Sequence, residues 1–473
     1  MTELHHLDAT TALELFVRRE LSPVELMRAV IARCDAVNVQ VNALTESLFE
    51  EALDAAKDAE KLYVRGVENP GLLGLPVATK EKHPIAGRTL SQGLVARRQE
   101  ISTRTHPAVD RIIRAGGIVH ARTTSSEYSC ATVTHSPLWG VTRNPWNLAC
   151  SPGGSSGGSG AALAAGMTPL ATASDIAGST RVPASFTGSV GYKAPYGRIP
   201  GMPPLSADNY RGDGPMARTV ADTALLANVM IGRDPDDHTS LRPSITIPPG
   251  GETVSGTRVA LCVRLGDHPV TEEVETNTRA VAAALAEAGA VVEEVELPWT
   301  TREIRETIFT HFGYLLGPAM EDETAGGEDL LAAYTVRFMA DARAAAARHR
   351  YLDGVRTETR MQSELAAAMS GFDVLLCPTS CTPALDADGD YLDGITVDGT
   401  ELGHYWESHL TAPFNICNRC PVLAVPSGGS ASGVPTGVQI VGHPFDDATV
   451  FRVGAAVERV RPWSGRHPLS EAR

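Results

Sequence analysis

The run Gly153-Gly154-Ser155-Ser156-Gly157-Gly158-Ser159-Gly160 is the densest candidate for chemistry in the chain. Its Gly153-x4-Gly158 spacing resembles a phosphate-binding loop, but Ser159 stands where that loop requires a lysine. The same run contains the G-x-S-x-G pattern of a nucleophile elbow, with Ser155 at its centre. An elbow requires a strand before Ser155 and a later histidine, for which the candidates are His404, His409, His443 and His467. A flexible linker is disfavoured because the apolar residues 161–165 follow directly, which indicates a loop that opens onto a buried helix.

A second serine, Ser179, lies 24 residues beyond Ser155 in the segment Ser174-Asp175-Ile176-Ala177-Gly178-Ser179-Thr180-Arg181. The small residues before it allow several backbone N–H groups to converge on one point, where they can hold a developing oxyanion. Alone this signal is weak, since a Gly-Ser pair usually marks only a turn.

Lysine is rare in this chain, because only five of the 41 basic residues are lysines. Lys80 closes the apolar run Leu75–Thr79. Burial at the end of a strand lowers a lysine pKa from about 10.4 and leaves a neutral amine that can accept a proton. The alternative is a surface lysine of which only the stem is buried, and Lys82 competes for the same role.

The spacing of the cysteines and of the acidic residues does not predict a metal site. Cys417 and Cys420 have C-x-x-C spacing, but no second pair or nearby histidine completes a zinc set. The sequence has no H-E-x-x-H, and the acidic loop Asp386–Asp393 lacks the twelve-position calcium pattern. We therefore expect neither a metal nor a cofactor.

The elements that must position these residues read as an α/β chain. Residues 8–65 read as helices, one of which begins at Ser22-Pro23-Val24-Glu25 with a cap, a first-turn proline and an acid. Further helices are predicted over residues 271–288 and 302–370. The predicted strands are Leu75–Thr79, Ile118–Ala121, 258–264, Val291–Leu297, Asp373–Cys377, Val422–Pro426 and Val438–Val441. One large α/β domain fits this order better than three separate domains.

Composition excludes several functional classes. The 473 residues include 41 basic and 56 acidic ones, for a net charge of −15, and an acidic surface repels nucleic-acid phosphates. The first residues show no signal peptide, and no apolar run reaches the roughly 18 residues that span a bilayer. We expect a cytoplasmic protein with no nucleic-acid or membrane partner. Eight cysteines in this length do not indicate a disulfide framework.

The order and spacing of Lys80, Ser155 and Ser179, 75 and 24 residues apart, resemble the amidase signature family of serine hydrolases. Flanking segments match as well: Ala121-Arg122-Thr123, Gly140-Val141-Thr142-Arg143-Asn144-Pro145-Trp146, Gly214-Pro215-Met216-Ala217-Arg218 and Gly437-Val438-Gln439-Ile440-Val441-Gly442. The resemblance covers nearly the whole chain. It implies a single large α/β/α domain over residues 1–473, with a central mixed twisted sheet covered by helices. Within it lie N-terminal helices at 1–65, a signature core at 70–220 and a helical substrate-pocket segment at 300–370.

The resemblance also implies roles for individual residues. Ser179 would be the nucleophile that forms an acyl-enzyme, and Ser155, after a cis peptide bond at Gly154, would relay its proton to neutral Lys80. The implied oxyanion hole consists of the backbone N–H groups of Ile176, Ala177, Gly178 and Ser179. Ala177 departs from the family's usual glycine, and its methyl group narrows this space. Asp175 and Arg181 are expected to support the loop.

By the same resemblance, the substrate-binding residues are Tyr128, Ser129, Cys130 and Ile440, with further walls from Ile308, Phe312, Tyr314 and Leu315. These side chains suggest a substrate with a neutral or aryl-bearing acyl group. No arginine or lysine cluster in the sequence indicates a substrate with a carboxylate. Lys193 reads as structural because the family's usual proline is displaced by one place.

The expected activity is hydrolysis of the carbon–nitrogen bond in an amide, anilide, acyl hydrazide or carbamate, with a homodimer as a candidate assembly. Two alternatives stay open. One is an α/β-hydrolase-type esterase with Ser155 as nucleophile. The other is a protein like the A-type subunit of a tRNA-dependent amidotransferase, although Gly403-His404-Tyr405-Trp406-Glu407-Ser408-His409 differs from that branch.

Overall fold

The structure is a computed structural model that describes residues 3–66, 71–251 and 253–469. Its strands, in chain order, are β1 (Leu44–Ser47), β2 (Pro76–Lys80), β3 (Ile118–Thr123), β4 (His135–Ser136), β5 (Gly140–Val141), β6 (Leu170–Asp175), β7 (Val190–Lys193), β8 (Gly212–Ala217), β9 (Arg258–Leu261), β10 (Val291–Glu294), β11 (Val374–Pro378), β12 (Ile395–Val397), β13 (Thr400–Leu402), β14 (Val422–Gly429) and β15 (Pro435–Gly442). Eleven of them form one sheet in the order β1-β3-β2-β6-β8-β7-β14-β15-β11-β9-β10.

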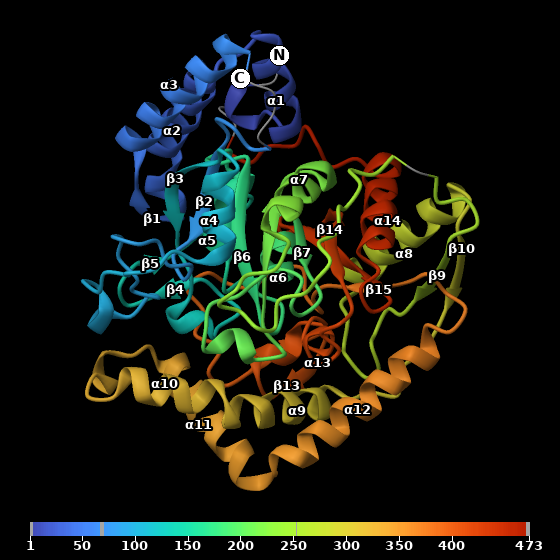
Figure 1. Ribbon diagram of the computed structural model, residues 1–473. Coiled ribbons are helices and arrows are strands. Elements are labelled where there is room, and N and C mark those ends of the chain that lie inside the picture. The colour runs from blue at the N-terminus through green and yellow to red at the C-terminus, as the bar shows by residue number, and fades with distance from the viewer. Residues whose placement is uncertain (1–2, 67–70, 252, 470–473) are drawn as a thin grey trace.

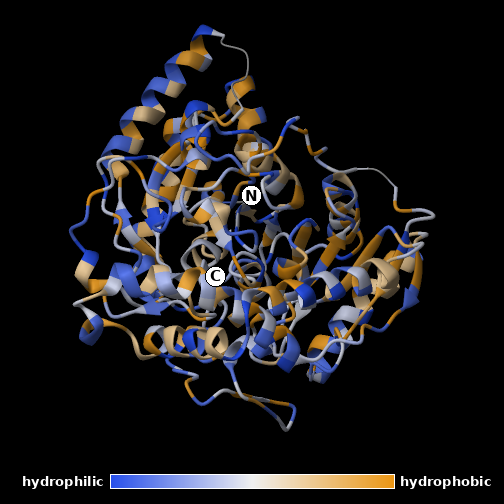
Figure 2. Cartoon of the chain, turned by 60° about the horizontal axis from the view of Figure 1, so that its bottom comes forward, coloured by the Kyte–Doolittle hydropathy of each residue, from blue (hydrophilic) through white to orange (hydrophobic). Residues whose placement is uncertain are grey.

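The helices are α1 (Ala9–Arg18), α2 (Pro23–Val41), α3 (Phe49–Arg65), α4 (Pro107–Arg114), α5 (Gly157–Ala164), α6 (Arg181–Thr187), α7 (Val220–Met230), α8 (Glu272–Glu287), α9 (Thr301–Tyr314), α10 (Leu316–Thr324), α11 (Ala333–Arg348), α12 (Tyr351–Ala368), α13 (Pro413–Ile416) and α14 (Asp447–Val460). Many of them carry hydrophilic and hydrophobic residues along the same ribbon, as helices with one buried face do (Figure 2). Within the described ranges, every helix is too short or too polar to cross a bilayer.

The large sheet is mixed. β2 runs parallel to β3 and β6, and β9 runs parallel to β10 and β11, whereas the other pairings are antiparallel. Helices flank the sheet, and α9 to α12 form a further layer along the bottom of the molecule in Figure 1. The expected α/β fold, a mixed central sheet covered by helices, is confirmed. That residues 1–473 form a single domain stays a prediction.

Alternation along β15 separates the two faces of the sheet. Gly437 approaches Ser185 of α6, and Gln439 bonds to Arg181 at the start of α6. Ile440 belongs instead to the core cluster that contains Val450, Phe451 and Val453 of α14. Because successive side chains of a strand point to opposite faces, α6 and α14 cover opposite sides of this strand.

The predicted strands are all present, with ends shifted by no more than about three residues, and the predicted strand–helix–strand unit is β9, α8 and β10. The predicted helix start at Ser22 is confirmed, because Ser22 Oγ accepts from the Glu25 N–H and the Glu25 side chain accepts from the Ser22 N–H. Four strands of the large sheet were not predicted. β1 interrupts the helical region 8–65, and β6, β7 and β8 consist largely of small or polar residues that lack the usual β-branched signal.

Candidate active site

Lys80, the last residue of β2, has a completely buried side chain. Its Nζ lies 2.7 Å from Ser155 Oγ and 3.0 Å from both Ser156 Oγ and Ser174 Oγ. Ser174 is the last residue but one of β6, the parallel neighbour of β2, so the carboxyl ends of adjacent strands bring these groups together. Sequence reasoning missed Ser156 and Ser174 as partners of Lys80. Their signals are adjacency to Ser155 and a place at the end of the neighbouring strand.

Burial lowers the pKa of Lys80 well below its usual value of 10.5, and the charge of Lys82 lowers it further against the opposing carboxylate of Asp213. The neutral amine that results keeps two N–H donors and gains one acceptor lone pair. Ser156 Oγ donates to the Ser174 carbonyl at 3.4 Å, so it accepts from Lys80. Ser155 Oγ has no other side-chain partner among the described residues, and its hydroxyl is therefore placed to donate to the lone pair of Lys80.

Lys82, the competing lysine, does not reach these hydroxyls. Its Nζ lies 4.0 Å from Asp213 Oδ1, on the nearby strand β8. The geometry therefore favours Lys80 over Lys82 as the base for a serine.

The glycine-rich run brings Ser155 against β2 and β3. The Gly154–Ser155 peptide bond is cis, as the family resemblance implied. A Cβ on Gly158 would lie 2.3 Å from Thr124 Oγ1, and one on Gly154 would lie 2.5 Å from the Val133 carbonyl oxygen. Only glycine permits approaches this close. Helix α5 begins at Gly157 and is buried along its whole length, which confirms the loop that opens onto a buried helix.

Ser179 precedes α6 by two residues and is half-buried, unlike Ser155, which is fully buried. The Ser179 carbonyl accepts the Ser156 N–H at 3.3 Å, so the two serine segments lie side by side. Within the described chain, the Ser179 hydroxyl forms no hydrogen bond. Lys80 and Ser155 are therefore in hydrogen-bond contact, whereas Ser155 and Ser179 are not, and the proton relay through the three residues stays a prediction. Such contacts are often long before substrate binds.

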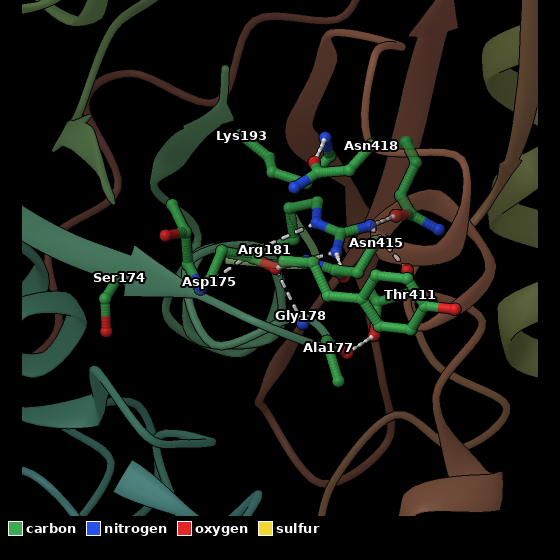
Figure 3. Close-up of polar contacts among 12 residues, drawn as sticks. Ser174, Asp175, Ala177, Gly178, Arg181, Lys193, Thr411, Asn415 and Asn418 are labelled. Carbon is green, nitrogen blue, oxygen red and sulfur yellow. Dashed lines mark hydrogen bonds and ion pairs between the residues drawn. The ribbon is translucent and has the colours of Figure 1, made fainter. Parts of the chain in front are cut away.

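Residues 176–179 form the loop whose backbone N–H groups were predicted to bind the oxyanion. The structure differs from this prediction at one of these N–H groups. The Gly178 N–H donates to Asp175 Oδ1 at 2.8 Å, so this group, predicted to face the oxyanion, is already occupied (Figure 3). Gly178 has φ +129°, and a Cβ there would lie 2.1 Å from Thr411 Oγ1, which explains the glycine. The Thr411 hydroxyl in turn donates to the Ala177 carbonyl. The remaining predicted donors, the N–H groups of Ile176, Ala177 and Ser179, have no protein acceptor in the described part of the chain.

The fully buried Arg181 side chain supports the loop of residues 176–179 through Asp175. Its Nε and Nη2 donate to Asp175 Oδ2 and Oδ1 at 3.0 and 2.8 Å, and its Nη1 donates to Gln439 Oε1 at 2.7 Å. Burial alone would raise the pKa of Asp175, but the Arg181 charge and hydrogen bonds lower it to about 2. Asp175 and Arg181 thus support the loop, as expected. Lys193 donates to Asn418 Oδ1 at 2.6 Å (Figure 3).

The predicted pocket residues have different surroundings in the structure. Tyr128 and Ser129 have φ +53° and +60°, and Tyr128 is buried beside the charges of Glu323 and Arg97. Cys130 is buried, with its Sγ directed at the Glu127 carbonyl and Thr335 Oγ1.

Three further expectations are corrected. Ile440 follows Gln439 on β15, so its side chain points to the opposite face of the sheet, which α14 covers. Ile440 is therefore a core residue and not a pocket residue. Tyr314 and Leu315 are 40% and 37% exposed at the outer end of α9, so they are not pocket walls. Ile308 and Phe312 are buried, and Phe312 packs in an aromatic cluster with Phe309, Phe338 and Trp406.

The nucleophile-elbow interpretation finds no support in the geometry. No strand precedes Ser155 among the described residues near it. His409 bonds to Ser380 Oγ at 2.7 Å, His443 bonds to the Phe372 carbonyl at 2.7 Å, and His404 lies 3.5 Å from Asp341. His467 stacks on His6. None of the four histidines contacts Ser155.

Comparisons with known proteins agree on one family. The Amidase family model matches residues 25–451. An acylamidase of Rhodococcus erythropolis is 33% identical over 481 residues, which cover 99% of this chain and 98% of that protein. The A-type subunit of a glutamyl-tRNA(Gln) amidotransferase from Chloroflexus aggregans is 32% identical over 496 residues, which cover 99% of both proteins.

Two solved structures are similar over almost the full length. A bacterial aryl acylamidase of the amidase signature family superimposes with a TM-score of 0.90 at 25% identity and covers 98% of both chains. A 6-aminohexanoate cyclic dimer hydrolase superimposes with a TM-score of 0.86 at 29% identity and covers 99% of both chains.

Proposed function

The chain belongs to the amidase family, and from that premise we propose that it hydrolyses a carbon–nitrogen bond of a small amide-type substrate through an acyl-enzyme on Ser179. The observation that carries the proposal is the contact of a buried Lys80 amine with Ser155 Oγ at 2.7 Å, next to the loop that bears Ser179. A serine hydroxyl is a weak nucleophile and needs an adjacent base, and a neutral buried lysine is such a base.

In the proposed first half-reaction, Ser179 Oγ attacks the substrate carbonyl carbon while its proton passes to Ser155 Oγ, and the Ser155 proton passes to Lys80 Nζ. The carbonyl oxygen becomes an oxyanion that the free N–H groups of Ile176, Ala177 and Ser179 can stabilise. Lys80 then returns the proton through Ser155 to the departing nitrogen. The C–N bond breaks, the amine leaves, and the acyl group stays on Ser179.

In the second half-reaction, water attacks the acyl ester and passes a proton by the same relay to Lys80. The ester bond to Ser179 breaks, Ser179 regains its proton, and a carboxylic acid leaves. Ser156 and Ser174 are proposed to keep the Lys80 amine oriented through both steps, because each accepts one of its N–H groups.

The substrate class is amide, anilide, acyl hydrazide or carbamate. A neutral or aryl acyl group remains our prediction for the part of the substrate near Tyr128. We also propose a cytoplasmic enzyme that needs no metal for this chemistry, and a homodimer as its assembly. The amidotransferase alternative has a specific observation in its favour, which is the 32% identity to the A-type subunit of such an enzyme.

Labelling with a small fluorophosphonate, followed by peptide mass spectrometry, tests the proposal. We expect an adduct on Ser179 that forms about 10²–10⁴ times more slowly in Lys80→Met and is absent in Ser179→Ala. Ser363→Ala, an exposed serine on α12, is the matched control and keeps the wild-type rate. An adduct on Ser155 would instead support the alternative in which Ser155 is the nucleophile of an α/β-hydrolase-type esterase. No hydrolysis of any amide by the isolated protein, with activity restored only by partner subunits, would instead support the amidotransferase alternative.

A further inference from the structure

A cavity of about 360 Å³ is lined by two cations, of which Lys82 has only a long ion pair, 4.0 Å from Asp213, and Arg211 forms no ion pair within the described chain. Its lining includes Lys82, Arg211 and Asp213, with Gln92 on the side of Tyr128. The Gln92 carbonyl accepts the Tyr128 N–H at 2.8 Å, so the cavity wall is continuous with the segment that carries Tyr128. A volume in this range suits a small-molecule site.

The strand register places this cavity next to the reacting groups. Ser174 pairs with Asp213 and Asp175 pairs with Gly212, so Arg211 directly precedes the residue that pairs with the start of the oxyanion loop. Lys82 follows Lys80 by two residues. Lys82 and Arg211 therefore lie at the same edge of the sheet as Lys80 and Ser174.

The other arginines of the cavity are already paired with acids. Arg97 binds Glu100 and Glu323, and Arg104 binds Asp236. Neither of these arginines is therefore free to receive an anionic ligand.

The acids nearest to the two cations are hydrogen-bonded mainly to other groups, although Asp208 Oδ2 has no hydrogen-bond partner and the charge of Asp208 acts on both Arg211 and Lys82. The Asp213 carboxylate lies 2.9 Å from His83 Nε2 and 3.3 Å from His106 Nε2, and Asp208 accepts from His311 and from the Tyr210 N–H. These contacts leave Lys82 with Asp213 at 4.0 Å as its nearest anion.

Arg211 is the more exceptional of the two cations. Its Nε is buried and has no hydrogen-bond partner, and its guanidinium forms no ion pair within the described chain. Its backbone is nevertheless fixed, because the Arg211 carbonyl accepts from Asn418 Nδ2 at 3.2 Å. A buried donor without a partner costs stability unless a ligand satisfies it. Burial and the charge of Arg211 also lower the pKa of Lys82 to about 7.

His83, His106 and Asp213 have ligand atoms close enough to suggest a metal site. His106 Nδ1, however, accepts the Ala108 N–H at 3.2 Å, so the ring carries a proton on Nε2, which lies 3.3 Å from Asp213 Oδ2. A protonated nitrogen cannot ligate a metal. The two histidines therefore hold the Asp213 carboxylate, and the cluster does not offer three free ligand atoms to a metal ion.

From these contacts we propose that Lys82 and Arg211 bind a carboxylate of the substrate, so that the preferred substrate is an amide that carries a negative charge. This inference rests on the proposed function and narrows its substrate class. It also revises the expectation that no lysine–arginine cluster exists, because the fold brings together two cations that lie 129 residues apart in the sequence.

Two matched pairs of anilides test the proposal and locate the charge. N-phenylsuccinamate against butyranilide places a carboxylate on the acyl side, and 4-acetamidobenzoate against acetanilide places it on the amine side. We expect wild-type kcat/KM to favour the charged member of one pair at least tenfold. Lys82→Met and Arg211→Gln bring that ratio toward one, whereas Lys82→Arg retains it. Lys61→Met, an exposed lysine on α3, is the matched control and leaves the ratio unchanged.

Equal rates within both pairs, or a preference that neither variant reduces, would overturn the inference while leaving amide hydrolysis intact. If none of the four anilides is hydrolysed, anilides leave the proposed substrate class, and the proposed function fails only if the fluorophosphonate also fails to label Ser179. Calorimetric titration with succinate and with benzoate then decides the carboxylate site separately. Binding that weakens at least tenfold in Arg211→Gln supports the site, and no binding by the wild type rejects it. Circular dichroism of each variant confirms that it folds, and Lys82→Arg with Arg211→Gln suffices if Lys82→Met does not.

Discussion

The carboxylate of Asp175 accepts the backbone N–H of Gly178 at 2.8 Å and thereby closes the loop that leads to Ser179. The same carboxylate also receives two hydrogen bonds from the buried Arg181 guanidinium. One side chain thus fixes both the path of the loop of residues 176–179 and the position of the Arg181 guanidinium. The N–H groups that stay free, those of Ile176, Ala177 and Ser179, owe their orientation to this arrangement.

Asp175→Asn is expected to lower kcat about 10²–10³-fold, because its amide oxygen can replace only Oδ1, which accepts from Gly178 and Arg181 Nη2. The amide NH2 group cannot accept from the Thr180 N–H and Arg181 Nε, which donate to Oδ2. It also leaves the Arg181 charge buried without its counter-ion, which costs about 3–5 kcal/mol. Steady-state kinetics and urea unfolding measure the two effects. Asp388→Asn, which removes an exposed ion pair with Arg143, is the control and changes stability by less than about 1 kcal/mol. Similar values for both variants would contradict the supporting role of Asp175.

The pH dependence of kcat/KM reports the state of Lys80. A base must be neutral to act, so activity falls as pH drops through its pKa, which burial and Lys82 hold well below 10.5. With a neutral anilide, we expect the acidic limb to move to higher pH in Lys82→Met, since the nearby positive charge that lowers the pKa of Lys80 is gone. A limb that stays in place when Lys82 is changed, or one that moves when His409 is replaced, would reject Lys80 as the titrating base.

Gly158→Ala tests the close approach of α5 to β3. The new Cβ would lie 2.3 Å from Thr124 Oγ1 and 2.5 Å from the Thr124 backbone nitrogen and oxygen, so the helix must move. We expect a loss of about 1–3 kcal/mol in the free energy of unfolding, measured by urea, together with reduced activity because Ser155 and Ser156 move with the helix. Gly429→Ala is the control, because no atom lies within 4 Å of its Cβ position. An equally stable Gly158→Ala would show that α5 can shift freely.

Sequence patterns sufficed for those elements whose residues have a strong periodic signal. β9, α8, β10, β11 and β14 combine apolar runs with clear flanking turns, and they appear close to where they were predicted. β8 contains two glycines and a proline, and β6 alternates small residues, so tertiary pairing with neighbours decides their conformation. The spacing of Lys80, Ser155 and Ser179 predicted a shared site, and the structure places Lys80 in contact with Ser155.

The parts of the site that escaped prediction depend on register and on side-chain competition. Ile440 differs from Gln439 only by pointing to the other face of β15, which a one-residue shift decides. Gly178 was expected to face the oxyanion, but Asp175 competes for its N–H through a local turn that no motif records. Lys82 and Arg211 meet only because β2 and β8 flank β6. Such pairs follow from topology rather than from spacing.

Glu458 on α14 provides a stability switch far from the candidate site. Its carboxylate accepts the Val220 N–H at 3.1 Å. Burial, together with the nearby Asp8 and Asp222, raises its pKa to about 7 against the opposing hydrogen bond from Val220. The folded protein therefore keeps a proton that the unfolded chain, with a pKa of 4.5, releases at lower pH. Its stabilising contribution is complete below pH 4.5 and is lost as pH rises through about 7.

Glu458→Gln keeps the acceptor oxygen for Val220 but removes the charge at every pH. We expect the variant to melt at a higher temperature than the wild type at pH 8, with a difference that shrinks at pH 5, because there the wild-type carboxyl is already protonated. Thermal unfolding followed by circular dichroism at both pH values measures it. Glu296→Gln, an exposed glutamate, gives the same small difference at both. A Glu458→Gln advantage that is equal at pH 5 and pH 8 would mean that packing, and not the buried charge, sets the stability at this position.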